Sequence, residues 1–202
     1  FFALAAVLAL GFFGMMVQSN AIAATLNTAF GVPVVATGAV LVLISGAVFF
    51  GGVRRLASVT EKVVPIMAAV FLLGAVAVLI ARVRYLPEAF AMIFRYAFQP
   101  QAIIGGAAGA ALKKAITQGA KRGLFSNEAG MGSTPHAHAL ANVDKPHDQG
   151  VVAIVGIFID TFVVLTLNAL VIISTLYAGG GVLSGGARPE GIMSSNMAQK
   201  AF

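Results

Sequence analysis

The stretch GLFSNEAGMGSTP, residues 123–135, holds three glycines, a proline and five polar side chains in a chain whose other long segments are apolar. Gly130 and Gly132 permit backbone conformations closed to other residues, and Pro135 cannot donate the hydrogen bond of a continuing helix. In a bilayer, irregular backbone survives only where protein or a water-filled cavity satisfies its polar groups. The stretch therefore predicts a discontinuous helix whose open ends are available to a solute or an ion.

Composition places the rest of the chain in a membrane. Of the 202 residues, 59% are hydrophobic and 10% are charged, whereas about 25% are charged in a soluble domain. Residues 31–53 and 63–81 carry no charged side chain, and each stretch has about the 20 residues that a spanning helix needs. We therefore expect an all-α integral membrane protein that crosses the lipid bilayer of the cell membrane several times.

The charges and the absence of cysteine narrow the functional classes. A net charge of +6 suits loops and lipid headgroups, and the aromatic–basic interleaving of single-strand nucleic-acid binders is missing. Without cysteine, disulfides and thiolate metal sites are excluded. Since the chain begins inside an apolar stretch and ends in a polar one, we expect an internal piece of a longer protein. Residues 1–202 would be a single transmembrane domain, incomplete at both ends.

The pattern of apolar runs and breaks predicts five well-defined helices, at residues 1–28, 33–52, 56–82, 86–98 and 149–178. The first becomes polar from Gln18 onward, and a proline at residue 33 ends it. Ser58 and Thr60 are possible N-caps of the third. The fourth is amphipathic and aromatic, which suits a membrane interface. Residues 179–200, rich in glycine and serine, are expected to be a loop.

The broken stretch also carries side chains suited to ion chemistry. Ser126 and Asn127 offer neutral oxygen ligands of the kind that hard cations prefer. Glu128 is a carboxylate in a costly place, and its functional role would be the counter-charge of a cation or the carriage of a proton. The alternative is a buried pair with Lys121, with Arg122 or with a residue outside this chain.

A second acid lies in the last predicted helix. Asp160, followed directly by Thr161, interrupts a run that is otherwise apolar. Ionisable residues inside a membrane helix mark ion or proton pathways by default. The alternative is a structural role, in which Asp160 hydrogen-bonds an adjacent helix.

Enzyme chemistry is not indicated. Ser126 lacks the Gly-x-Ser-x-Gly elbow of a hydrolase, and the Gly-rich loop of phosphate binders does not occur. His136 and His138 are two residues apart, so on a helix they would point to different faces, and loop histidines are the favoured interpretation. We expect no catalytic residues and no cofactor other than a coupling ion.

Three blocks of sequence resemble the alanine or glycine:cation symporter family, the sodium:alanine symporters. They are RGLFSNEAGMGSTP at 122–135, MVQSNAIA at 16–23 and GIFIDT at 156–161, and they occur in the order found in that family. The resemblance implies a LeuT-like fold of two inverted five-helix repeats. This chain would supply about the third to seventh transmembrane helices, with the discontinuous helix at 123–135 as the sixth.

The resemblance also implies a function and a site. The protein would be a secondary active transporter that couples Na⁺ or H⁺ entry to uptake of alanine or glycine by alternating access. Gln18 would face the substrate, together with an unwound segment formed by Phe125, Ser126, Asn127, Ala129 and Gly130. The candidates for ion coupling are Glu128, Asp160 and Thr161, in a Na⁺ site shared with helices outside this chain. The alternative is a membrane channel or a non-transporting membrane subunit, which could not concentrate a solute uphill.

Overall fold

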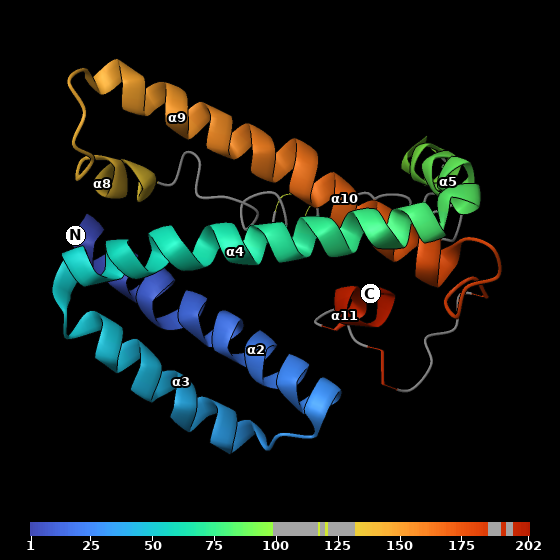
Figure 1. Cartoon of the computed structure of the whole chain (residues 1–202), viewed down its shortest axis with the longest axis horizontal. Coiled ribbons are helices and arrows are strands. Elements are labelled where there is room, and N and C mark those ends of the chain that lie inside the picture. The colour runs from blue at the N-terminus through green and yellow to red at the C-terminus, as the bar shows by residue number, and fades with distance from the viewer. Residues whose placement is uncertain (99–116, 118–119, 121–131, 186–190, 193–195) are drawn as a thin grey trace. The chain divides into compact units, whose positions relative to one another are not determined.

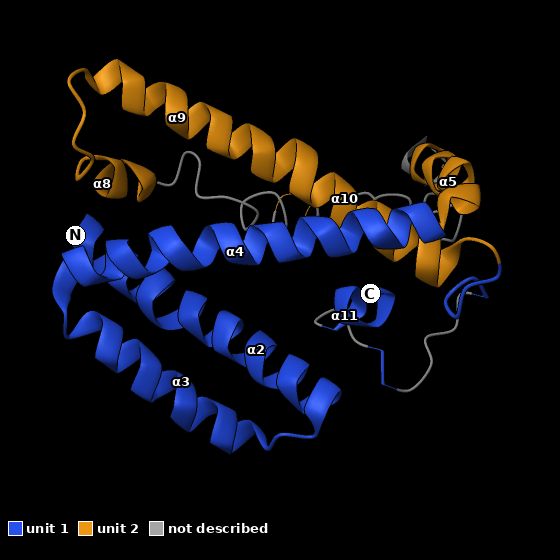
Figure 2. Ribbon diagram, viewed as in Figure 1, with its two compact units in different colours: residues 1–81, 180–202 blue, residues 82–179 orange. Residues whose placement is uncertain are grey.

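The computed structural model of the chain describes residues 1–98, 117, 120, 132–185, 191–192 and 196–202. All regular elements among these residues are helices, which confirms the all-α prediction (Figure 1). The chain divides into two compact units, which we call unit 1 (residues 1–81 and 180–202) and unit 2 (residues 82–179) (Figure 2). The LeuT-like repeat and the single transmembrane domain remain predictions.

Unit 1 begins with one long apolar helix. The segments α1 (Phe2–Ala6), η1 (Val7–Gly14) and α2 (Met15–Phe30) follow one another as a helix of 29 residues. It ends at Gly31, whose φ of +67° is a left-handed conformation that glycine adopts readily. The Asn27 side chain donates a hydrogen bond to the Val32 carbonyl at 3.0 Å and so closes the turn. The predicted end of this helix near residue 28 is close to the observed one.

The next two helices complete the main body of unit 1. Helix α3 (Val34–Phe49) packs against both α2 and α4 (Gly52–Ala81). The prediction that Ser58 and Thr60 cap the third helix is wrong, because α4 already begins at Gly52. Instead, the Thr60 hydroxyl donates to carbonyls one turn back in its own helix, at 3.0 Å to Leu56 and 3.0 Å to Ala57.

A short helix near the end of the chain, α11 (Met197–Ala201), packs on this body. Gln199 donates its amide N–H to the Thr25 carbonyl of α2 at 3.0 Å. The Phe202 ring lies 5.7 Å from that of Phe71 in α4, centroid to centroid. The predicted loop over 179–200 is therefore wrong at its end, because burial of apolar groups against unit 1 stabilises a helical turn there.

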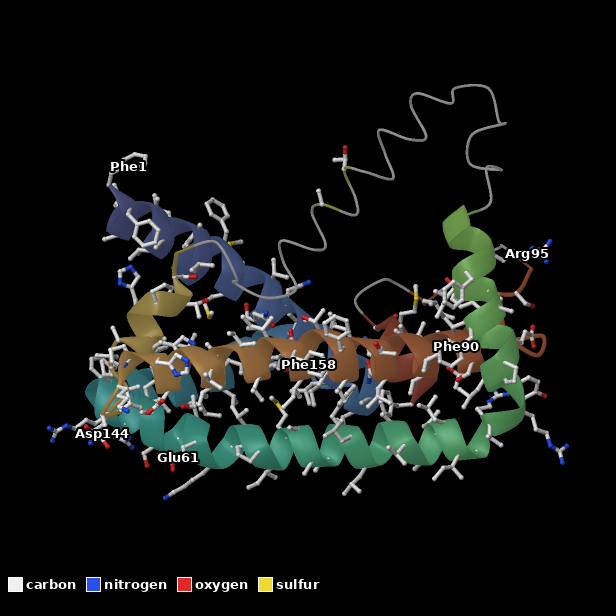
Figure 3. All side chains as sticks on the ribbon, turned by 90° about the horizontal axis from the view of Figure 1, so that it is seen from above. Phe1, Glu61, Phe90, Arg95, Asp144 and Phe158 are labelled. Atoms are coloured by element: carbon white, nitrogen blue, oxygen red, sulfur yellow. The ribbon has the colours of Figure 1, made fainter. Side chains whose placement is uncertain are left out.

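Unit 2 combines short helices with a second long one. Its short elements are η2 (Val83–Tyr85), α5 (Leu86–Phe98) and α8 (Thr134–His138). Its long helix, which we call the last span, has 32 residues and joins α9 (Pro146–Phe158), η3 (Ile159–Val164), α10 (Leu165–Ile172) and η4 (Ile173–Tyr177). Helix α5 crosses the carboxyl end of the last span and contacts α10 and η4 (Figure 3).

Three of the described helices are long and apolar enough to cross a membrane: Phe2–Phe30, Gly52–Ala81 and Pro146–Tyr177. Their lengths correspond to ~44–48 Å at 1.5 Å per residue, more than the ~30 Å of a hydrocarbon core. Helix α3 is apolar too, but its 16 residues reach only ~24 Å. It is shorter than the predicted 33–52 because Phe50 and Gly51 form a turn before α4 begins.

Candidate functional site

The broken stretch is described only at its end. Residues 121–131 lie outside the described residues, and with them the predicted site residues Phe125, Ser126, Asn127, Glu128, Ala129 and Gly130. Gly132 has φ +87°, and a helix begins at Thr134 with Pro135 in its first turn. The predicted restart of a helix near residue 134 is confirmed. This helix, α8, has five residues, and the discontinuity before it remains a prediction.

Gln18 lies on the first span, just after its irregular portion. The π-helical segment η1 ends at Gly14, and Gln18 follows in the first turns of α2 with its side chain exposed on unit 1. The neighbouring Ser19 hydroxyl bonds to the Met16 carbonyl of its own helix at 3.2 Å. A glutamine amide offers both donors and an acceptor. It is therefore suited to the carboxylate or the ammonium of an amino acid.

The last span carries its acid in an irregular turn. Asp160 and Thr161 are the second and third residues of η3, where the Leu165 N–H bonds to the Asp160 carbonyl five residues earlier. Such π-helical turns are rare and occur frequently at functional sites. The sequence gives no warning of this turn, because residues 159–164 contain neither glycine nor proline. Its only sequence signal is the polar pair itself.

Around Asp160 the last span has an aromatic face and a polar face. The rings of Phe158 and Phe162, one turn apart, stack with centroids 4.8 Å from each other. Asp160 lies midway between them in sequence, about half a turn round the helix, and its side chain is half-buried. Figure 3 marks Phe158 on the span. This arrangement suits a helix whose aromatic pair meets lipid and whose carboxylate meets protein or water.

Two hydroxyl side chains nearer the carboxyl end of the last span bond to their own helix. In η4, Thr175 donates to the Val171 carbonyl at 2.6 Å, and Ser174 donates to the same carbonyl at 3.3 Å. Hydroxyl groups commonly bond back to their own helix when water is absent. Among the π-helical segments that the structure describes, η3 alone combines an acid with a hydroxyl.

Two of the histidines have described partners, one in another helix and one in its own helix. The His138 ring and the Gln149 amide are hydrogen-bonded, which links α8 to the start of the last span. His147 and Asp148 form an exposed pair at 3.6 Å. Within the described ranges, no group of three His, Cys, Asp or Glu side chains could hold a metal ion.

Comparison with known proteins gives consistent matches along the chain. The model of the sodium:alanine symporter family matches residues 1–202. A sodium/proton-dependent alanine carrier protein of Bacillus sp. strain PS3 is 40% identical over 79% of this chain and 35% of its own length. A probable sodium/glutamine symporter of Bacillus subtilis, GlnT, is 38% identical over 97% of this chain and 40% of its own length. The chain thus spans little more than a third of these relatives.

Proposed function

The chain belongs to the sodium:alanine symporter family, a family of transporters rather than enzymes, and we propose that the full-length protein couples cation entry to uptake of a small neutral amino acid. The observation that carries the proposal is the half-buried carboxylate of Asp160 in a π-helical turn of an apolar span. A fixed negative charge at that depth is costly unless a cation or proton compensates it. In a channel or a non-transporting subunit, coupling would not be required.

The residues that we propose to contact the amino acid are Gln18 of the first span and five residues of the broken stretch. Gln18 would contact the substrate with its exposed amide, and Phe125 to Asn127 with Ala129 and Gly130 would supply backbone groups and a small apolar wall. A pocket lined by phenylalanine and glycine favours alanine or glycine by size. The relatives support this class, since one is named an alanine carrier and another a probable glutamine symporter.

The coupling ion would be Na⁺ or H⁺, with Glu128, Asp160 and Thr161 as the candidate coupling residues and further ligands from outside the chain. Cation and amino acid would stabilise the same state of the alternating-access cycle. Each would then raise the affinity for the other, by thermodynamic linkage. This reciprocity separates a symporter from a protein that binds the two independently.

The experiment is uptake of radiolabelled alanine by the full-length protein in proteoliposomes. With an inward Na⁺ gradient, alanine should rise above its external concentration, and collapse of the gradient should return it to equilibrium. A proton gradient at equal Na⁺, and competition by glycine and glutamine, would identify the coupling ion and the substrate range. Equilibration without accumulation under both gradients would refute symport and favour the channel.

A further inference from the structure

The two ends of unit 2 lie together at one corner of the unit. The chain enters unit 2 at Arg82 and leaves it after Gly179 (Figure 2). The Gly179 N–H donates to the Glu88 carboxylate at 3.1 Å, and the Tyr85 ring lies so close that a Cβ on Gly179 would overlap it. The Arg82 guanidinium lies over the same ring, 5.3 Å from its centroid. We call these four residues the corner.

Both connections through the corner have the character of hinges. Gly179 and its neighbour Gly180 have φ of +62° and +74°, a region in which residues with a Cβ are strained. On the other connection, a single 3₁₀ turn, Val83–Tyr85, joins α4 to α5. Hinges are typically a few residues at the ends of elements that absorb large backbone rotations.

We propose that the corner is the hinge of the transport cycle, and that Tyr85, Glu88 and Gly179 are positioning residues that hold both connections on one axis. The proposal rests on the proposed function, because alternating access requires one part of the protein to rotate against another. The chain segments that enter and leave unit 2 are held together at the corner. Such an attachment permits rotation about the corner and opposes sliding of one segment past the other. None of the three residues is among the proposed substrate or ion contacts.

The lengths of the helices that leave the corner amplify a small rotation. Helix α4 ends at the corner after 30 residues, and the last span ends there after 32. Each helix is therefore a lever of ~45 Å, and a rotation of ~10° moves its far end by ~8 Å. The largest displacement is expected at the far ends, near Phe50 and His147.

The two neighbouring glycines provide a matched test in the full-length protein. A Cβ at Gly179 would overlap Tyr85, whereas a Cβ at Gly180 meets no atom within 4 Å, and both positions have a left-handed φ. Gly179→Ala should lower the maximal rate of Na⁺-driven alanine uptake by about ten-fold and leave KM within about two-fold. Gly180→Ala should lower that rate by less than about three-fold. Equal effects of the two variants, or a change in KM as large as that in rate, would overturn the proposal.

Two further variants separate a hinge from a loss of folding. Tyr85→Ala combined with Gly179→Ala should recover part of the rate, because the overlapping ring is gone, so the two effects should not be additive. Glu88→Gln keeps an oxygen acceptor for the Gly179 N–H and should transport normally. Glu88→Ala should be slowed several-fold. The proposed positioning role would be contradicted if the losses of uptake rate in the double variant were additive. It would also be contradicted if Glu88→Ala transported as fast as Glu88→Gln.

A distance measurement tests the hinge independently of transport. The chain has no cysteine, so spin labels can be placed at Phe50→Cys and His147→Cys of the full-length protein in nanodiscs, with any other cysteine replaced. Two distance populations are expected, with Gly179→Ala shifting their ratio more than Gly180→Ala does. One population in all three proteins would refute the hinge. A wild-type protein that shows two populations but no alanine accumulation would refute only the proposed function.

Discussion

Helix α4 and the last span are nearly equal in length, with 30 and 32 residues, but differ in how their backbones are paired. Helix α4 stays α-helical from Gly52 to Ala81 although Pro65 lies inside it. The last span changes to π-helical pairing at Ile159–Val164, around its acid, and again at Ile173–Tyr177. In these two helices the proline leaves the backbone regular, whereas one of the two irregular turns of the last span holds the candidate acid.

The largest expected effect is at the acid of the last span. If Asp160 carries the counter-charge of the coupling ion, Asp160→Asn should lower Na⁺-driven alanine accumulation at least about ten-fold, since an amide cannot supply the charge. Proteoliposome uptake with and without a Na⁺ gradient measures it. The matched control is Asp144→Asn, at an exposed turn before the last span (Figure 3). Full accumulation by Asp160→Asn would remove this acid from the coupling mechanism.

An intermediate effect is expected on the first span. Gln18→Ala should remove one hydrogen bond to the amino acid and so weaken alanine binding by ~1–1.5 kcal/mol, which is about a five- to ten-fold rise in its Kd. Ser19→Ala is the control, because the Ser19 hydroxyl bonds to its own helix. Equilibrium binding of labelled alanine to the purified full-length protein would distinguish them. Unchanged affinity in Gln18→Ala would place this side chain outside the site.

The smallest effect is expected in α4. Pro65→Ala restores an N–H that can bond to the carbonyl of Glu61, four residues earlier, so the thermal midpoint should stay the same or rise. Uptake should remain within about two-fold of wild type, since α4 is assigned no contact with substrate or ion. A loss of transport with a normal thermal midpoint would show that Pro65 itself is needed for function. The two helices would then no longer differ in whether their irregular or helix-breaking residues serve transport.

The main helices could be predicted from sequence because their signals are local. Uncharged runs of about 20 residues mark spans, and glycine or proline marks several of their ends, as at Gly31 and Pro146. The π-helical turn at Asp160 could not be predicted, since its pairing depends on neighbours and its sequence contains no helix breaker. The contact of Gly179 with Tyr85 and Glu88 was equally hidden, because it joins residues about 90 positions apart. Helix α11 could not be predicted for the same reason, since its hydrogen bond joins residues 174 positions apart.

The positions of some candidate site residues could also be predicted, whereas their roles stay predictions. The sequence places Asp160, Thr161 and Gln18 in apolar helices, where the structure has them, and Gly132 with Pro135 predicts the helix that begins at Thr134. The roles of these residues follow from the family resemblance rather than from spacing. The predicted contacts of residues 125–130 remain predictions, as those residues lie outside the described part of the chain.

The hydrogen bond from Gln199 to Thr25 sets an order of events during synthesis. It joins residues 174 positions apart. At ~5–20 residues per second, a ribosome needs ~9–35 s to make Gln199 after Thr25. Throughout that interval the Thr25 carbonyl lacks its Gln199 partner. Among the described contacts of unit 1, those of α11 can therefore form only after residues 197–201 have been synthesised.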